Sequence, residues 1–308
     1  MSIVINTPTS NIGRALVARL LDAGERVTVL SRDKAKVDDF HRRGARVVEG
    51  SFEEPALLAE ALEGAEALFW LTPPPARPDY YAWATKCAKQ AAAAAKKAGT
   101  RRAVVLSSMG AHSGPGTGVV GPAREMENDF EAALPAVVSL RPGIFMENFL
   151  QSTDMIAKAG QIFLPIQGGK RWPVVATADI AAKAASWLLD RGWSGHHRVG
   201  VHGPKDLSAD EAAETISAVL GAPVKCVEAT IDQARGVMKG MGMPDFVVEL
   251  LIEQYGAFRD GRLDPAERRT PDTTTSTTLA EFARTTLVPA IRGVSTLKPG
   301  SDPQGECS

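Results

Sequence analysis

The first residues whose types could do chemistry lie at positions 7–13, where hydroxyl side chains precede a single glycine. An apolar run at residues 3–5 predicts a strand, and an amphipathic run at 12–23, followed by Gly24, predicts a helix. A helix that begins behind a buried strand can bind phosphate, because its free N–H groups and its dipole favour negative charge. We therefore predict that a dinucleotide contacts Thr7, Thr9, Ser10, Asn11 and Ile12.

This stretch departs from the usual glycine-rich loop of dinucleotide-binding proteins. Thr7 and Ser10 stand where the first two glycines would be, and only Gly13 remains. A positive φ at either position would cost roughly 1 kcal/mol or more, because each residue carries a Cβ atom. Gly13 would serve close packing of helix on strand with or without a ligand. The sequence leaves two alternatives, a loop that still binds a cofactor and one that has abandoned it.

The end of the second predicted strand indicates which dinucleotide would bind. Arg32 stands there, and the position has no acidic residue to accept hydrogen bonds from a ribose 2′-hydroxyl. A guanidinium suits a 2′-phosphate, so NADP(H) is predicted over NAD(H), with Lys34 and Lys36 as helpers. The alternative is that these basic residues only form the solvated start of a helix.

Few other residues are candidates for catalysis or metal binding. His112 follows the fifth predicted strand and Tyr81 follows the loop after the fourth, so both are weak candidates for a proton donor. His196 and His197 are adjacent and would point to opposite faces of a strand, so we predict no metal site. Arg141, in an apolar run, needs a carboxylate partner if it is buried, and Glu127 or Glu147 could provide one.

The elements that must position these residues alternate between strands and helices. Apolar, β-branched runs predict seven strands, at residues 3–5, 26–30, 46–49, 67–71, 103–106, 137–140 and 197–201. Amphipathic runs separate the first five of them, whereas the stretch 160–173 is too irregular for the main sheet. This alternation predicts a Rossmann-type, doubly wound α/β fold with a parallel sheet and a small C-terminal substrate-binding lobe.

Several stretches in the same order resemble the NmrA-like family of atypical short-chain dehydrogenases/reductases, to about residue 290. The most specific is residues 140–148, and residues 50–52, 71–73, 106–110, 172–180 and 202–204 are also similar. The resemblance implies further cofactor contacts at Ser51, Phe52, Leu71, Thr72, Pro73, Ser108, Pro142 and Gly143. It also implies that Met109, Phe145 and Phe149 line a substrate pocket over the nicotinamide.

The domain organisation expected from this resemblance is one NmrA-like domain over residues 1–293. Its dinucleotide-binding core would be about residues 1–150 with the strand near 197–201. The substrate lobe would be about residues 151–180 and 225–290. A capping box at Ser208 and Glu211 predicts a helix that ends at Gly221. The amphipathic pattern of residues 231–255 predicts a further helix. Residues 294–308 are polar and rich in Gly and Pro, which predicts a disordered tail.

The composition limits the partners that are expected. The formal net charge of -1 gives no reason to expect binding to nucleic acid or to a membrane surface. The chain has no apolar run of the length of a membrane span. Its 3 cysteines are far apart and match no metal or disulfide pattern. We expect an unprocessed, soluble, cytoplasmic monomer or homodimer that acts on a small molecule.

Three functions fit this sequence. The favoured one is an NADPH-dependent oxidoreductase that transfers hydride to a small conjugated or aromatic molecule such as a quinone, imine or enone. However, Val119 and Ala123 stand where classical relatives of the family have the proton-transferring Tyr and Lys. Their presence favours the second function, a non-catalytic NADP(H)-sensing regulator. The third is a cofactor-independent cyclase or isomerase on the same fold, which Thr7 and Ser10 would permit.

Overall fold

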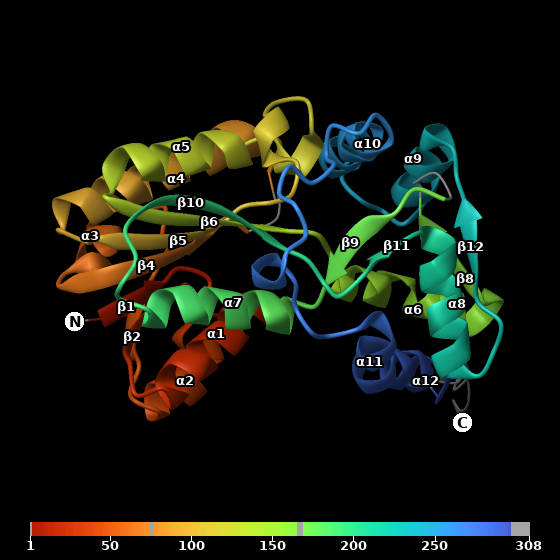
Figure 1. Cartoon of the computed structure of the whole chain (residues 1–308), viewed down its shortest axis with the longest axis horizontal. Coiled ribbons are helices and arrows are strands. Elements are labelled where there is room, and N and C mark those ends of the chain that lie inside the picture. The colour runs from red at the N-terminus through yellow and green to blue at the C-terminus, as the bar shows by residue number, and fades with distance from the viewer. Residues whose placement is uncertain (1, 74–76, 165–168, 297–308) are drawn as a thin grey trace, which may run out of the picture.

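The computed structural model describes residues 2–73, 77–164 and 169–296 of the chain. At its centre is a sheet of seven parallel strands in the order β10-β6-β5-β4-β1-β2-β3 (Figure 1). These strands are β1 (Ser2–Ile5), β2 (Arg26–Ser31), β3 (Arg46–Glu49), β4 (Ala65–Leu71), β5 (Arg102–Leu106), β6 (Ala136–Pro142) and β10 (Gly195–Val201). All seven predicted strands are in this sheet, which confirms the Rossmann-type α/β prediction.

Helices cover both faces of the sheet. One face carries α1 (Asn11–Asp22), α2 (Asp38–Arg42) and α7 (Thr177–Leu189), and the other carries α3 (Pro55–Leu62), α4 (Tyr80–Lys97) and α5 (Ala123–Ala133) (Figure 1). Strand β4 shows why its sequence is continuously apolar: Phe69 packs with α1 and α7, whereas Leu68 and Trp70 pack with α3, α4 and α5. Successive side chains of a strand point to opposite faces, so a strand between two helical layers needs apolar residues at every position.

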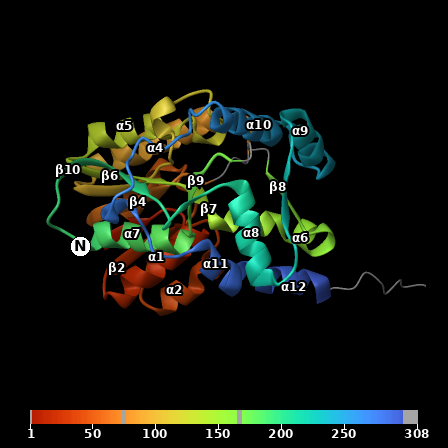
Figure 2. The ribbon, with the colours of Figure 1, turned by 45° about the vertical axis from the view of Figure 1, so that its right-hand side comes forward.

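A smaller lobe lies beyond the carboxyl ends of the parallel strands (Figure 2). It has a three-stranded sheet of β7 (Ile144–Phe145), β9 (Trp172–Val175) and β11 (Asp206–Leu207), and a pair of β8 (Gln161–Leu164) and β12 (Lys225–Glu228). Its helices are α6 (Thr153–Ala159), α8 (Ala209–Leu220), α9 (Ile231–Gly240), α10 (Asp245–Arg259), α11 (Leu279–Phe282) and α12 (Val288–Thr296). Strand β8 pairs with β12, and β9 pairs with β7 and β11, all within the lobe. The prediction that residues 160–173 stay outside the main sheet is therefore confirmed.

Short helical turns connect several of these elements. The turns of 3-10 helix are η1 (Lys34–Val37), η2 (Ala111–Ser113), η3 (Gly118–Val120), η4 (Met146–Ser152) and η5 (Pro271–Thr273), and η6 (Ala283–Leu287) is a π-helical turn. The predicted capping box is present at α8: Ser208 Oγ accepts from Glu211 N at 3.1 Å, and Glu211 Oε2 accepts from Ser208 N at 3.0 Å. The predicted stop at Gly221 is confirmed by its φ of +76°.

Two boundaries differ from the sequence-based expectations. Residues 231–255, predicted to be continuously helical, form two helices separated by Gly242, whose φ of +76° ends α9, and by Pro244 at the start of α10. Helix α12 continues to Thr296, whereas the remainder of the predicted tail, residues 297–308, lies outside the described residues. Within the described ranges, no helix has the length and apolarity needed to span a bilayer.

Candidate functional site

The loops that carry the predicted cofactor contacts meet at one edge of the sheet. Strands β1 to β6 are parallel, so the residues that follow them all emerge at the carboxyl edge, next to the lobe (Figure 1). Ligands of open α/β sheets bind outside this edge. The topology therefore brings the residues after β1, β2, β3, β4, β5 and β6 into one region, as the sequence predicts.

The loop after β1 is built without glycine at its first two expected positions. Ser10 N and Ser10 Oγ both donate to the Thr7 carbonyl, at 3.3 and 3.0 Å, and Ser10 Oγ accepts from Gly13 N at 2.9 Å. Ser10 is thus the N-cap of α1, with an extended backbone at φ −70°. No residue other than glycine has a positive φ in the described part of the chain, so Thr7 and Ser10 avoid the strain that a positive φ would impose.

Gly13 is required by the packing of this loop. A Cβ atom at Gly13 would lie 1.9 Å from the Thr7 carbonyl oxygen and 2.9 Å from Ser10 Oγ. The carbonyl belongs to the backbone and cannot rotate away as a side chain can. Gly13 therefore allows the first turn of α1 to lie directly against the strand-to-helix turn, which is the structural role predicted for it.

The first turn of α1 fits an anionic group. The amides of Asn11 and Ile12 have no acceptor within the helix, because they belong to its first turn, whereas Ser10 Oγ already satisfies the amide of Gly13. Thr9 and Asn11 are exposed beside them, and the Ile12 side chain is buried in the core. The residues present can therefore hold a diphosphate through two amides, although one fewer than an uncapped helix would offer.

A buried asparagine, which the sequence analysis missed, joins two of the loops. Asn6 directly follows β1 and is 3% exposed. Its Nδ2 donates to the carbonyl of Leu71, the last residue of β4, at 2.8 Å, and its Oδ1 accepts from Leu71 N at 2.9 Å. Both polar ends of the amide are used, so Asn6 fixes the carboxyl end of β4 relative to the loop that precedes α1.

We predict that Asn6→Ala lowers the free energy of unfolding by about 2–4 kcal/mol, because it leaves the buried N–H and C=O of Leu71 unpaired. Urea unfolding followed by circular dichroism measures the change. Asn128→Ala, at an exposed position of α5, serves as the control and is expected to stay within about 0.5 kcal/mol of the parent. A loss below about 1 kcal/mol for Asn6→Ala would show that the two bonds contribute little.

The loop after β2 leaves one guanidinium free. Arg32 is exposed and forms no ion pair with any residue that the structure describes. Asp33 accepts from Ala35 N at 3.0 Å and so caps η1, and its other oxygen lies 3.9 Å from Lys36 Nζ. Lys36 is therefore already close to a carboxylate, and Arg32 is better placed than Lys36 to bind a phosphate.

The loops after β3 and β4 meet through aromatic rings. Phe52 packs edge-on against Trp70, with ring centroids 5.3 Å apart, and lies 6.0 Å from Trp83 of α4. Thr72 Oγ1 accepts from Trp70 Nε1 at 3.2 Å, and Ser51 Oγ accepts from Glu53 N at 3.2 Å. The predicted residues Ser51, Phe52, Leu71, Thr72 and Pro73 thus border the same part of the edge.

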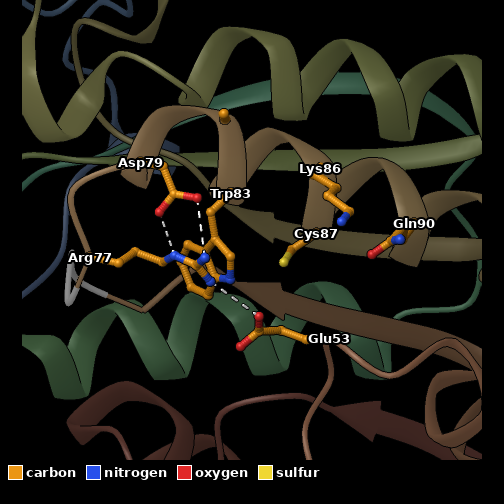
Figure 3. A pocket seen from close by; sticks show the side chains of 8 residues that line it. Glu53, Arg77, Asp79, Trp83, Lys86, Cys87 and Gln90 are labelled. Carbon is orange, nitrogen blue, oxygen red and sulfur yellow. Dashed lines mark hydrogen bonds and ion pairs between the residues drawn. The ribbon is translucent and has the colours of Figure 1, made fainter.

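A cavity that the sequence does not indicate lies next to these loops. It has a volume of about 210 Å³ and extends between Glu53 and the first half of α4 (Figure 3). Arg77 bridges the carboxylates of Asp79 and Glu53, at 2.6 and 3.4 Å, along this cavity. Cys87 also lines it, and burial raises the pKa of its thiol to about 11, so this cysteine is not activated as a nucleophile.

The loops after β5 and β6 are tied to each other and to the lobe. Met109 N donates to the Pro142 carbonyl at 3.0 Å, and Gly143 N donates to the Val201 carbonyl at 3.1 Å. A Cβ atom at Gly143 would lie 2.2 Å from the Pro173 carbonyl, so only glycine fits there. Ser108, Pro142 and Gly143 are therefore held at the carboxyl edge, where the resemblance to the family places them.

The three residues predicted to line the substrate pocket are not brought together. Met109 is buried with Trp172 and Phe258, Phe149 is buried in a separate cluster within the lobe, and Phe145 packs on the sheet core next to α7. Met109 and Phe149 are 2% and 6% exposed, so their side chains already fill space in the protein core. Their role in a substrate pocket stays a prediction.

The two weak candidates for a proton donor, His112 and Tyr81, have different surroundings. His112 lies exposed in η2. Tyr81 donates to Glu125 of α5 at 3.1 Å, and burial together with this carboxylate raises the pKa of its phenol.

The two adjacent histidines both lie next to backbone carbonyls. His196 Nε2 lies 3.0 Å from the Leu134 carbonyl, and His197 Nε2 lies 2.8 Å from the Ser194 carbonyl. Among the described residues, no group of three His, Cys, Asp or Glu side chains could hold a metal ion.

A buried ion pair lies behind the carboxyl edge. Arg141 donates through Nε and one terminal nitrogen to both oxygens of Glu127, at 2.8 and 2.6 Å, and through the other to Glu267, at 2.7 Å. Ser107 Oγ adds a bond to Glu127 at 2.5 Å. Burial lowers the pKa of Arg141, but Glu127 and Glu267 outweigh burial and raise it above its usual value. The guanidinium therefore stays charged.

One of the two predicted partners of Arg141 is correct. Glu127 pairs with it, whereas Glu147 accepts from Thr177 N at 3.0 Å and from Thr177 Oγ1 at 2.5 Å. Glu147 is wrong as a partner because it caps the start of α7. Glu267, which the sequence analysis missed, comes from the loop between α10 and η5 and connects the lobe to the core.

Comparison with known proteins agrees with this fold. A family model described as NAD(P)H-binding matches residues 9–154. An NAD(P)H azoreductase from Xenophilus azovorans is 31% identical over 281 residues, which cover 90% of this chain and 94% of that protein. The chain also aligns with an NADPH-dependent quinone oxidoreductase from Escherichia coli, solved with NADPH (TM-score 0.79, 21% identity, 91% of this chain and 98% of that one). The structure of the negative transcriptional regulator NmrA, solved with NADP, is also similar (TM-score 0.77, 18% identity). The alignment covers 96% of this chain and 98% of that one.

The parallel sheet, the capped helix behind β1 and the loops at the carboxyl edge define a nicotinamide-dinucleotide-binding protein of Rossmann type. Within that class, the chain belongs to the NmrA-like family of atypical short-chain dehydrogenases/reductases. The resemblance on which the sequence-based expectations depend is thus confirmed.

Proposed function

We propose that this protein is an NADPH-dependent oxidoreductase that reduces a small conjugated or aromatic molecule, such as a quinone, an imine or an enone. The observation that carries the proposal is the start of α1 at the carboxyl edge, where the amides of Asn11 and Ile12 have no acceptor in the part of the chain that the structure describes. The azoreductase relative, similar over 90% of this chain, supports a redox activity. A bound NADPH supplies the hydride that such a reduction requires.

The chain's own residues would hold and orient the dinucleotide. The amides of Asn11 and Ile12 bind the diphosphate, and the exposed Arg32 binds the 2′-phosphate. Asn6 keeps the loop before α1 and the end of β4 in register, which fixes Thr72 and Pro73 beside the ligand. Ser108, Pro142 and Gly143 border the nicotinamide end, next to the lobe that covers the substrate.

Titration of the purified protein with NADPH and NADH by calorimetry tests the first half of this proposal. NADPH is expected to bind more tightly than NADH. If it binds, the absorbance of NADPH is followed in the presence of a quinone, an imine and an azo dye, and its oxidation by at least one of them is expected.

Other outcomes of these experiments identify the alternative functions. Binding of neither nucleotide would contradict the proposal and favour the cofactor-independent isomerase or cyclase. Binding without oxidation by any acceptor would favour the regulator. That second outcome has a structural basis, because Val119 and Ala123 provide no proton donor at the positions of the classical Tyr and Lys.

We predict that Arg32→Ala weakens the binding of NADPH by roughly tenfold or more and leaves NADH almost unaffected, because a charge-assisted contact to the 2′-phosphate is lost. The ratio of the two dissociation constants is the measurement. Arg42→Ala, which removes an exposed partner of Asp38 on α2, is the control of equal charge. An equal loss of affinity for both nucleotides would refute the role of Arg32.

A further inference from the structure

One tyrosine of the lobe, Tyr255, has no hydrogen-bond partner among the described residues. The chain has 3 tyrosines; Tyr80 donates to the Val119 carbonyl at 3.4 Å and Tyr81 to Glu125 at 3.1 Å. Tyr255, on α10, is partly buried between two apolar clusters, and no acceptor for its phenol is found in the part of the chain that the structure describes. Its phenol is therefore available to donate to an acceptor that the described residues do not provide.

Tyr255 packs close to the candidate site. It lies against the cluster that contains Met109, Ala123 and Trp172. Met109 lies in the loop after β5, and Ala123 stands at the position of the missing lysine. Tyr255 thus brings a phenol from the lobe to the region where the classical proton-transferring pair is absent.

The contact between α10 and the core is closely fitted, so the position of Tyr255 is well defined. Gly118 N donates to Glu253 of α10 at 3.0 Å. A Cβ atom at Gly118 would lie 2.1 Å from the Leu250 carbonyl, and its φ of +61° also favours glycine. These contacts fix the helix turn that carries Tyr255 directly against η3.

A second unpartnered donor belongs to the same cluster. Trp172, on β9, is 3% exposed, and its Nε1 is buried without an acceptor among the described residues. An unpaired buried donor costs roughly 1–3 kcal/mol, so the indole N–H of Trp172 needs an explanation. The indole N–H of Trp172 can only donate, and the Tyr255 phenol, whose pKa is raised by burial, keeps its proton and can donate as well. The missing ligand atom is therefore an acceptor.

We infer that Tyr255, with Trp172 of the same cluster, donates a hydrogen bond to a carbonyl oxygen or azo nitrogen of the bound substrate. This inference rests on the proposed function and narrows its substrates to conjugated molecules that carry such an acceptor. The reduction adds a hydride from the nucleotide and a proton from water to the substrate. Tyr255 stabilises the atom on which negative charge gathers between these two additions and orients it for protonation.

The test compares Tyr255→Phe with the parent, using menadione as the quinone. Calorimetry on protein loaded with NADP⁺ measures menadione binding without turnover, and steady-state assays measure KM and kcat. Tyr255→Phe is expected to weaken menadione binding about tenfold, which corresponds to one hydrogen bond to a partly charged acceptor, and to lower kcat. Its affinity for NADPH should be unchanged. Trp172→Phe is expected to weaken menadione binding in the same direction.

Tyr80→Phe is the matched control, because it also removes one phenol oxygen, but from a bond to the Val119 carbonyl. It is expected to keep the parent's dissociation constant for menadione. Values within twofold of the parent for both Tyr255→Phe and Trp172→Phe would overturn the inference. If the parent binds no nucleotide, the proposed function fails, and menadione binding to the nucleotide-free variants still decides the role of Tyr255.

Discussion

Glu127→Ala is expected to destabilise the protein by about 3–5 kcal/mol, one of the largest effects of a single substitution in this chain. The side chains of Glu127 and Arg141 are 0% and 3% exposed, so removing the carboxylate leaves a charged guanidinium in the protein interior without its main partner. Glu267 still accepts one of the Arg141 bonds, but Ser107 loses its acceptor and Arg198 loses a neighbouring charge. Urea unfolding, with a check that the m-value is unchanged, measures the loss.

Two further variants test whether the stability loss of Glu127→Ala comes from the unpaired buried charge of Arg141. Lys158→Ala removes an exposed ion pair with Asp154 and is expected to change stability by less than about 0.5 kcal/mol. The double variant Glu127→Met with Arg141→Met removes both charges and is expected to recover at least part of the loss, since apolar replacement of a buried pair is often tolerated. A double variant less stable than Glu127→Ala would show that the pair itself contributes net stability.

The fold was predictable because its main signal is local. A strand buried between two layers of helices is apolar at every position, as β4 is, and such runs can be recognised without knowledge of their neighbours. The capping box at Ser208 is equally local, because its two partners are three residues apart. The turn between α9 and α10 was missed because an amphipathic pattern continues through Gly242 and Pro244, and only backbone geometry ends the first helix there.

The site was predictable only in part, since its decisive contacts join residues that are far apart in sequence. The loops at the carboxyl edge follow from the parallel order of the strands. However, the pairing of Asn6 with Leu71 spans 65 positions and that of Arg141 with Glu267 spans 126. A polar residue in an apolar run was the available signal for Arg141, and it correctly indicated a carboxylate partner without identifying Glu267. That the phenol of Tyr255 lacks a partner among the described residues could be recognised only from the structure, which gives partners for Tyr80 and Tyr81.

The loop after β1 shows how a departure from a motif can be structurally neutral. Thr7 and Ser10 replace glycines, yet both keep ordinary backbone conformations, because Ser10 caps the helix instead of leaving its first turn open. The cap uses the amide of Gly13, which reduces the number of donors left for a phosphate. Retention of Gly13 is therefore the one requirement that the altered loop shares with the usual motif.

Gly13→Ala is accordingly expected to destabilise the protein by about 2–3 kcal/mol and to weaken NADPH binding at least about tenfold. The new methyl group would lie 1.9 Å from the Thr7 carbonyl, so α1 must move away from the loop and take the amides of Asn11 and Ile12 with it. Gly236→Ala in α9 is the matched control: no atom lies within 4 Å of the added Cβ, so stability should rise by up to about 1 kcal/mol with unchanged NADPH affinity. Thermal unfolding and calorimetric titration measure both quantities. Normal NADPH affinity in a folded Gly13→Ala variant would show that the nucleotide binds elsewhere than at the start of α1.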